Sequence, residues 1–317
     1  MKLKINNYDN LMKYLEQNAI IYLIDEPMKK HTTFGIGGPV DVIIFPKRIE
    51  ELLQIIKIIK KNKLNFHFMG SGSNVLVSDD GIKGVIISLK KSFKEVTFSK
   101  NKVYAQSGVM LGNFVKQLIG KNITGYESLI GVPGTLGGAL IMNAGAYGSE
   151  ISNNIISVRT LCLNGEIKTY QSEDINFSYR ESSFKNNEII IDAYFNCKYG
   201  DRVDIQKNKL SSSKSRKDNQ PLKFRSAGSI FKNPSDTLAA GYLIDKVGLK
   251  GSEHGGASIS EKHANFIVNM GGATAADVFH LIKLAKRKVA ENFHINLELE
   301  VKLIGFPKTM TQEVYHA

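Results

Sequence analysis

The sequence lacks the features that would place it among secreted, membrane-spanning or metal-dependent proteins. Its only two cysteines, Cys162 and Cys197, lie outside any C-x-x-C pattern, so we expect buried thiols rather than a disulfide framework or a thiolate metal cluster. No apolar run approaches the roughly 18 residues of a membrane span, and the opening residues MKLKINNYDN lack the apolar core of a signal peptide. The seven histidines show no metal-ligand spacing. We therefore expect a cytoplasmic protein without a metal or a membrane anchor.

Acidic residues are also scarce, since 30 Asp and Glu against 42 Lys and Arg leave a net charge of +12. Such a balance fits nucleic acid, an acidic membrane surface or an anionic small substrate, and composition does not choose among them. The lysines are spread along the chain rather than gathered in a stripe, which favours a solvated surface over a nucleic-acid partner. With 317 residues, 42% of them hydrophobic, the chain is long enough for two or three domains.

Two glycine-rich stretches match none of the standard nucleotide-binding motifs. Gly131 to Gly148 reads GVPGTLGGALIMNAGAYG, and its glycines would let the backbone approach an anionic ligand or a flat ring, although tight helix packing also explains such glycines. Gly70 to Asn74 reads GSGSN and offers backbone donors and two hydroxyls to a diphosphate. Because the GK[ST] of a nucleotide-hydrolysing loop is missing, this second stretch indicates diphosphate binding without hydrolysis.

The first third of the chain alternates strands and helices. A polar, glycine-rich turn at 31–39 precedes the β-branched strand VDVIIF, and apolar residues then recur at helical spacing from Ile49 to Ile59. Three further strands are expected at 65–70, 74–79 and 84–89. This order predicts βαβ units with a ligand-binding loop at the carboxyl end of a strand.

From about residue 100 the pattern becomes mostly antiparallel. Two strand-like runs flank Asn164-Gly165, a strong two-residue hairpin signal, and a further strand is expected at 189–199. A basic, serine-rich helix is expected at 205–220. We therefore place a domain boundary near residue 203.

The last third predicts a smaller mixed domain. Thr274 and Asp277 form a capping pair for a helix that runs to about residue 292. The run NLELEVKLIG at 296–305 alternates apolar and charged residues, as a half-buried strand does. Residues 305–317 show no clear periodicity, so we expect a frayed terminus there.

Three segments carry side chains suited to catalysis. Arg180, within FSYRESSFK, is either an ordinary surface cation or a planar fork for a carboxylate. Ser229 follows glycine in RSAGSIFKNP and is trailed by Lys232 and Asn233, but the GxSxG elbow and histidine partner of a serine hydrolase are missing. Glu300 lies on the polar face of the last strand and, taken alone, is expected to be solvated.

Seven segments, taken in order, resemble the UDP-N-acetylenolpyruvoylglucosamine reductase (MurB) family of peptidoglycan precursor synthesis. They are FGIGGP, GSGSNVLV, GVPGTLGGALIMNAGAYG, SYRESSFK, SAGSIFKNP, GGASISEKHANFIVN and LELEVKLIG, and they cover nearly the whole chain. The resemblance implies a mixed α/β and α+β fold, with a two-lobed FAD-binding domain of the vanillyl-alcohol-oxidase (PCMH) type and a smaller α+β substrate-binding domain. The implied divisions are a first lobe at 1–99, a second lobe at 100–203, the substrate-binding domain at 204–304 and a tail at 305–317.

The resemblance also implies a non-covalent FAD site and a catalytic set. Gly70 to Asn74 are expected on the FAD diphosphate, with Thr33 to Gly38 and Gly131 to Gly148 lining the remainder of the cofactor. The residues expected to contact FAD are Thr33, Gly37, Gly38, Gly70, Ser71, Gly72, Ser73, Asn74, Gly131, Pro133, Gly134, Gly137, Gly138, Asn143, Gly145 and Ala146. The residues carried over as catalytic are Arg180, Ser229 and Glu300, which replaces the surface interpretations given above. The residues expected to contact substrate are Tyr179, Lys217, Lys232 and Asn233.

The chain departs from part of the family in one respect. Some members carry an extra tyrosine-bearing loop and a folded insert before the third domain, and this chain is too short there. It therefore resembles the shorter class, and we do not transfer that tyrosine to Tyr194 or Tyr199.

The implied reaction is the NADPH-dependent reduction of UDP-N-acetylglucosamine enolpyruvate to UDP-N-acetylmuramate through bound FAD. We expect a monomer that binds neither nucleic acid nor membrane. Two alternatives stay open: another FAD-dependent oxidoreductase on the same fold, acting on a hydroxy acid or a sugar, and a basic nucleic-acid- or nucleotide-binding protein without catalysis. The latter predicts a colourless preparation.

Overall fold

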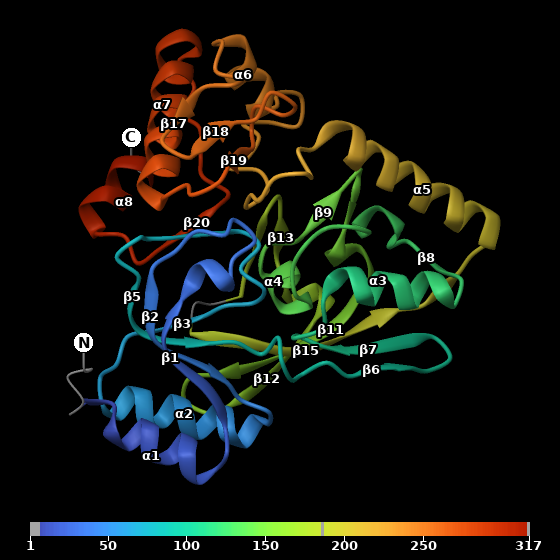
Figure 1. Cartoon of the computed structure of the whole chain (residues 1–317). Coiled ribbons are helices and arrows are strands. Elements are labelled where there is room, and N and C mark those ends of the chain that lie inside the picture. The colour runs from blue at the N-terminus through green and yellow to red at the C-terminus, as the bar shows by residue number, and fades with distance from the viewer. Residues whose placement is uncertain (1–6, 185–186, 316–317) are drawn as a thin grey trace. The chain divides into compact units, whose positions relative to one another are not determined.

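The computed structural model describes residues 7–184 and 187–315 (Figure 1). Its helices are α1 (Asp9–Gln17), α2 (Ile49–Lys61), α3 (Leu111–Gly120), α4 (Leu136–Ile141), α5 (Arg202–Asn219), α6 (Ala240–Lys246), α7 (Ala275–Phe293) and α8 (Lys308–Tyr315), with short 3-10 turns at Met28–Lys30, Glu127–Leu129, Ile151–Asn154 and Ser172–Asp174. The first ten strands are β1 (Ile21–Pro27), β2 (Pro39–Phe45), β3 (Phe66–Phe68), β4 (Val75–Val77), β5 (Ile82–Ile87), β6 (Val96–Phe98), β7 (Lys102–Gln106), β8 (Ile123–Thr124), β9 (Gly145–Ala146) and β10 (Ser149–Glu150). The remaining strands are β11 (Ile155–Cys162), β12 (Ile167–Gln171), β13 (Phe177–Ser178), β14 (Glu181–Ser182), β15 (Glu188–Asn196), β16 (Lys198–Tyr199), β17 (Glu253–His254), β18 (Ala257–Ile259), β19 (Ile267–Asn269) and β20 (Lys302–Ile304).

The chain forms two compact units, each assembled from three chain segments. Unit 1 comprises the described residues of Met1–Ile24, Asp41–Ser71 and Gly84–Lys214. Unit 2 comprises those of Asp25–Val40, Gly72–Lys83 and Ser215–Ala317. The sequence-based divisions at residues 99, 203 and 304 stay a prediction.

The first part of unit 1 is built around an amphipathic helix. The side chains of α2 that recur at helical spacing are buried, namely Leu52, Ile55, Ile56 and Ile59. Helix α1 lies beside α2 (Figure 1) and adds its own buried leucines to the same apolar cluster. Strand β3, which follows α2, pairs in parallel with β5 in a sheet of order β1-β2-β5-β3. The expected strand–helix–strand arrangement is therefore confirmed here.

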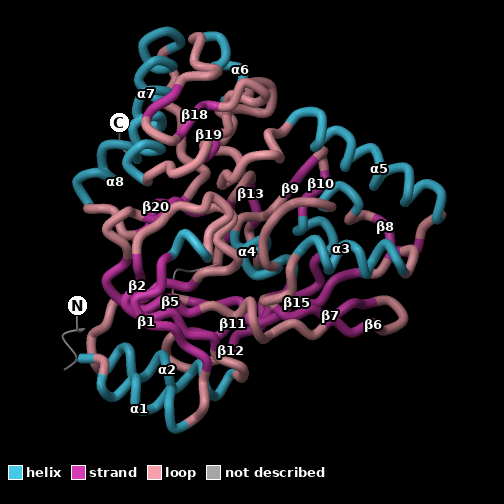
Figure 2. The backbone as a smooth tube through the Cα atoms, viewed as in Figure 1, coloured by secondary structure: helices cyan, strands magenta, loops and turns pink. Residues whose placement is uncertain are grey.

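The second part of unit 1 is a five-stranded antiparallel sheet of order β12-β11-β15-β7-β6. Figure 2 shows its strands side by side, with α3 and α4 over one face. Buried rings of Phe114, Tyr126 and Phe195 meet in the apolar cluster beneath those helices. The predicted hairpin is confirmed, because Gly165 has a φ of +96° in the turn between β11 and β12.

Unit 2 combines the antiparallel sheet β17-β18-β19 with α6 and α7 around one apolar cluster. The predicted capping pair is confirmed, since Thr274 accepts from the backbone of Asp277 while the Asp277 carboxylate accepts from the backbone of Thr274. The Asp79 carboxylate adds a second cap by accepting from Ala275 N at 2.8 Å and Ala276 N at 3.0 Å.

Three sequence expectations need correction. The run 296–305 is not one strand, because residues 298–300 bond to residues 230–232 whereas β20 pairs in parallel with β4, and this change of partner interrupts the ladder. Because β4 pairs with β20, it does not join the sheet that contains β3 and β5. The strand expected at 189–199 divides, with β16 pairing with β8. The tail expected to fray contains α8, whose Val314 is buried.

Candidate functional site

In unit 1 the stretch Gly131 to Gly148 forms the short helix α4 and strand β9, which pairs with β10 directly after the stretch. Thr135 caps α4, its Oγ1 accepting from Gly138 N at 3.4 Å. A Cβ added at Gly137 would lie 3.0 Å from the Ser107 Cβ, so tight packing explains this glycine. Gly138 is different, because an added Cβ would meet only the Thr135 hydroxyl, at 3.5 Å. The backbone at Gly138 is therefore accessible to a ligand.

The start of GSGSN lies against the same helix. A Cβ added at Gly70 would stand 2.4 Å from Thr135 Oγ1, which the fold does not permit. Gly70 O also accepts from Ser88 Oγ at 3.3 Å. Unit 1 thus brings Gly70 and Ser71 next to Thr135 at the N-terminus of α4, so the two glycine-rich stretches lie against each other there.

Three polar atoms around α4 are buried without a hydrogen-bond partner among the described residues: Ser71 Oγ, Ser107 Oγ and Asn143 Oδ1. The hydroxyl of Ser107 belongs to the residue that packs on Gly137, and Asn143 follows α4. Buried polar groups almost always have a hydrogen-bond partner. Three buried atoms without one therefore fit a bound molecule that supplies polar groups of its own.

Arg180 lies next to this cluster in unit 1. It is the second residue of the two-residue turn between β13 and β14, and its φ of +59° is rare for a side-chain-bearing residue. Its guanidinium lies over the Tyr179 ring at 4.9 Å, and its Nη1 is 3.5 Å from where a Cβ on Gly145 would be. Asn143 Nδ2 donates to Ser178 O at 3.1 Å, which ties the turn to the glycine stretch.

In unit 2, Ser229 and Glu300 lie on neighbouring segments. Ile230 O, one residue after Ser229, accepts from Glu300 N at 2.9 Å. On the other side, Ser229 forms an antiparallel bridge with Phe266. The segments that carry the sequence-predicted serine and glutamate therefore pair through their backbones, whereas the meeting of their side chains with each other and with Arg180 stays a prediction.

Asn265 is a positioning group that the sequence did not reveal. Its Oδ1 accepts from Phe231 N at 2.9 Å and its Nδ2 donates to Phe231 O at 2.8 Å. The side-chain amide therefore pairs with the main chain as a neighbouring strand would, two residues from Ser229. The Asn265 N–H donates to His263 Nδ1 at 3.3 Å, and burial lowers the pKa of His263. A lowered pKa keeps that imidazole neutral and able to accept. Asn265 lies in the sequence Ala-Asn-Phe, and nothing in these neighbours predicts that its side chain bonds to another segment.

The remaining predicted cofactor residues of unit 2 form two interlocked turns. Thr33 N donates to Gly72 O at 3.0 Å, and Thr33 Oγ1 donates to Ser226 O at 2.8 Å. A Cβ at Gly38 would lie 2.0 Å from Asp79 O and one at Gly72 would lie 2.2 Å from His31 O. These glycines are required by backbone packing, and whether they also touch a cofactor stays a prediction.

The four residues predicted to contact substrate have structural partners. Lys232 Nζ pairs with Glu298 Oε1 at 2.6 Å, and in this pair the lysine side chain is 16% exposed whereas the glutamate side chain is 67% exposed. Asn233 Oδ1 accepts from Ala240 N at 3.1 Å, and Lys217 O accepts from Lys262 Nζ at 2.6 Å. Tyr179 is 40% exposed. None of these contacts prevents an anionic substrate from being bound, because each leaves further donors on the side chain.

Comparisons with known proteins define the class first. Residues 40–171 match the family model described as an FAD binding domain, and residues 220–304 match the C-terminal domain of UDP-N-acetylenolpyruvoylglucosamine reductase. The chain is thus an FAD-containing oxidoreductase with the mixed two-lobed and C-terminal fold expected from the sequence. The unpartnered Ser71, Ser107 and Asn143 atoms and the open backbone at Gly138 fit such a cofactor.

Full-length relatives then give the family. The UDP-N-acetylenolpyruvoylglucosamine reductase of Alkaliphilus oremlandii is 41% identical over 303 residues, covering 95% of this chain and 99% of the relative, and that of Clostridium kluyveri is 43% identical over 283 residues, covering 89% and 92%. The crystal structure of the Thermus caldophilus reductase (MurB) aligns with a TM-score of 0.76 at 32% identity, over 90% of this chain and 98% of that one. This chain belongs to the UDP-N-acetylenolpyruvoylglucosamine reductase family.

Among residues 7–184 and 187–315, no three His, Cys, Asp or Glu side chains are grouped so that they could hold a metal ion. No helix in the described part of the chain is long and apolar enough to cross a membrane.

Proposed function

We propose that this protein reduces UDP-N-acetylglucosamine enolpyruvate to UDP-N-acetylmuramate with NADPH and bound FAD, in the cytoplasm, as a step of peptidoglycan precursor synthesis. The full-length relatives named for this reduction support the proposal. The observation that carries it in the structure is the pairing of the Ser229 and Glu300 segments through Ile230 O and Glu300 N at 2.9 Å. Proton delivery to a carbanion requires a proton donor held within hydrogen-bond reach of the carbon.

The proposed division of labour follows the sequence-based divisions, which differ from the two units in that residues 25–40 and 72–83 belong to unit 2. Residues 1–99 and 100–203 are assigned to the FAD-binding lobes, 204–304 to substrate binding and 305–317 to a tail, which accords with family matches at 40–171 and 220–304. FAD would be held by the glycine-rich turns and by Ser71, Ser107 and Asn143, and when bound it supplies hydride received from NADPH.

The substrate carbons determine what the side chains must do. Addition of hydride to the terminal vinyl carbon leaves negative charge on the neighbouring carbon and its carboxylate. Arg180, whose guanidinium lies over the Tyr179 ring, would hold that carboxylate with its planar fork. A preorganised donor of this kind stabilises such charge by on the order of 3 kcal/mol. Glu300, if it keeps its proton beside this carboxylate, would donate a second hydrogen bond.

Ser229 would deliver the proton that completes the lactyl ether. A serine hydroxyl is too weak an acid for most acid catalysis, but a carbanion is basic enough to take its proton. The alkoxide that remains needs a cation or a water relay. Lys232 is our candidate, because it follows Ser229 by three residues and its partner carboxylate, that of Glu298, is exposed.

A turnover assay tests this function. The purified protein should show flavin absorbance near ~450 nm and consume NADPH with UDP-N-acetylglucosamine enolpyruvate, but not with UDP-N-acetylglucosamine, which lacks the vinyl group. A colourless preparation would contradict the proposal. A different oxidoreductase on the same fold would be favoured by either of two results. In one, a hydroxy acid or a sugar reduces the flavin; in the other, oxygen but not the enolpyruvyl substrate reoxidises it.

A further inference from the structure

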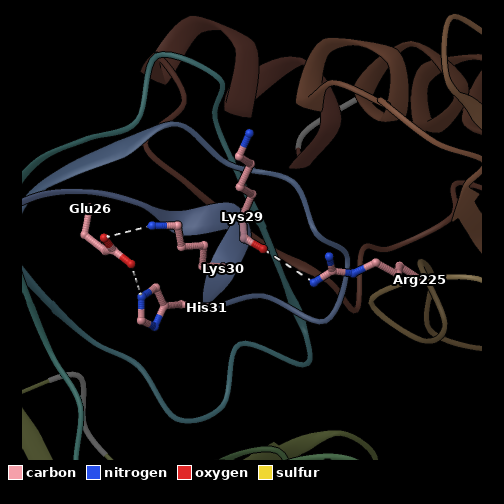
Figure 3. Close-up of polar contacts among 5 residues, drawn as sticks. All are labelled: Glu26, Lys29, Lys30, His31 and Arg225. Atoms are coloured by element: carbon pink, nitrogen blue, oxygen red, sulfur yellow. Dashed lines mark hydrogen bonds and ion pairs between the residues drawn. The ribbon is translucent and has the colours of Figure 1, made fainter.

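Arg225 clamps a turn of unit 2 onto the segment that carries Ser229. Its Nη2 donates to Thr32 O at 3.0 Å and to Lys29 O at 3.4 Å, and its Nε donates to Thr33 O at 3.4 Å. Figure 3 shows the guanidinium directed at the Lys29 carbonyl across the turn. One planar guanidinium therefore binds three carbonyls within residues 29–33, a geometry that the ammonium group of a lysine cannot reproduce.

The turn leaves space for this clamp because residue 35 is glycine. A Cβ added at Gly35 would lie 2.5 Å from the Arg225 Cζ and 2.6 Å from its Nε, so any side chain at position 35 competes with the guanidinium for the same space. The φ of +68° at Gly35 adds a second reason for glycine. Gly35 and Arg225 thus form a complementary pair.

The far side of the turn is held independently. Glu26 accepts from His31 Nε2 at 3.0 Å and from Lys30 Nζ at 3.4 Å (Figure 3). The backbone of Arg225 is also fixed, because its carbonyl accepts from Asn269 N at 2.9 Å. The guanidinium therefore connects two anchored pieces of chain rather than two loose ones.

The clamp lies close to the residues assigned to the reaction. Thr33 Oγ1 donates to Ser226 O at 2.8 Å, between Arg225 and Ser229, and Thr33 N donates to Gly72 O at 3.0 Å. Only Ser226, Ala227 and Gly228 separate the clamp from Ser229, and Gly228 has a φ of +82°, so the segment has little intrinsic stiffness of its own at that point.

We infer that Arg225 is a positioning residue for the reduction: its fork fixes the 29–35 turn against the 225–229 segment and so sets Ser229 and Thr33 in their working positions. This inference rests on the proposed function. Arg225 itself is exposed and holds the turn through main-chain carbonyls, so its effect is on position rather than on substrate binding. A displacement of about 1 Å at a reacting group can cost about 100-fold in rate.

The test compares Arg225→Ala, Arg225→Lys and Gly35→Ala with Lys223→Ala. Lys223 is a matched control, since it is an exposed cation two residues away that lines the same ≈ 750 Å³ cavity as Arg225. In the flavin-loaded protein, amide hydrogen exchange over residues 29–38 should be faster in the three test variants and unchanged in Lys223→Ala. Reoxidation of the reduced flavin by the enolpyruvyl substrate should slow by about ten- to a hundredfold in Arg225→Ala, while its reduction by NADPH stays within about threefold of the wild type.

Chemical rescue separates positioning from general damage. Millimolar guanidinium should restore part of the reoxidation rate of Arg225→Ala, whereas the same concentration of KCl should not. If Arg225→Ala does not fold, Arg225→Lys and Gly35→Ala carry the same test, with smaller losses expected.

Unchanged exchange and unchanged reoxidation in Arg225→Ala would overturn the inference, and so would equal slowing of both half-reactions without rescue. Failure of the proposed function is distinguished by the wild type alone. A wild-type protein that binds no flavin, or that leaves the enolpyruvyl substrate unreduced, overturns that function and this inference with it.

Discussion

The side-chain amide of Asn74 donates a 3.1 Å hydrogen bond to the main-chain carbonyl of Glu300. In return, Asn74 O accepts from Lys302 N at 3.0 Å. A residue from the predicted diphosphate loop thereby supports the segment that carries a predicted catalytic carboxyl, and both residues belong to unit 2.

Asn74→Ala tests the structural part of this relationship. Loss of the amide leaves a half-buried carbonyl without that donor, so the free energy of unfolding should fall by about 1–2 kcal/mol. Urea unfolding measures it, with Asn296→Ala, an exposed asparagine on the same segment, as the control expected to stay within about 0.5 kcal/mol. Equal stabilities of wild type and Asn74→Ala would show that the bond contributes nothing.

Ser229→Ala should separate the two half-reactions. FAD content and reduction by NADPH should be retained, whereas reoxidation by the enolpyruvyl substrate should fall by about 100-fold or more, because the proton donor is gone. Rapid-mixing absorbance near ~450 nm measures both steps. Ser235→Ala, which removes an exposed hydroxyl of the same region, should leave both rates unchanged. Equal damage to both half-reactions by Ser229→Ala contradicts the assigned role.

Glu300 is proposed to act as a neutral hydrogen-bond donor. Glu300→Gln keeps a donor of similar shape and should retain more activity than Glu300→Ala, which should lose about 100-fold in kcat. Glu298→Gln is the matched control, because this neighbour is an exposed carboxyl paired with Lys232. If Ala retains more activity than Gln, or if both equal the wild type, the donor role is wrong.

Acid should destabilise the protein through Glu26. The hydrogen bond from His31 lowers the pKa of Glu26 below its usual 4.5, and Lys30 lowers it further. Because the folded-state pKa lies below the unfolded one, this stabilisation is present above about pH 4.5 and is lost as pH falls through the folded pKa. The urea midpoint should therefore fall less between about pH 5 and about pH 3 in Glu26→Gln than in the wild type. Identical acid slopes would show that the pair has no such effect.

Helix α8 should stabilise the protein through a buried lysine. Lys286 Nζ donates to Leu297 O at 2.9 Å and to Val314 O at 2.7 Å, and burial lowers its pKa. Lys286→Ala leaves both carbonyls without that donor and creates a small cavity, so it should cost about 2–4 kcal/mol of unfolding free energy. Lys283→Ala, which removes only the exposed pair with Glu313, should cost less than about 1 kcal/mol. Equal losses in a urea titration would argue against an anchoring role.

Local sequence signals were sufficient where one segment determines its own structure. The helical spacing from Leu52 to Ile59, the Asn164-Gly165 turn and the Thr274–Asp277 cap all depend on neighbours within a few residues, and the structure confirms each. The same holds for the family assignment, which rests on motifs that are contiguous in sequence.

Other features depend on contacts between distant segments. The run ending at Ile304 alternates like a strand, yet its partners change from residues 230–232 to β4, and local periodicity does not record a change of partner. Helix α8 is held partly by the Lys286 contact to Val314 O, which the tail's own sequence does not reveal. The left-handed backbone of Arg180 was likewise hidden, because neither Tyr179 nor Arg180 is a typical turn residue.

The most direct measurement of the central claim is a single turnover without oxygen. Protein reduced by one equivalent of NADPH is mixed with one equivalent of UDP-N-acetylglucosamine enolpyruvate, and the absorbance near ~450 nm is followed while the product is identified by mass. We predict full return of the oxidised flavin spectrum and a product heavier than the substrate by two hydrogens. A spectrum that stays bleached, with the substrate recovered unchanged, would contradict the account.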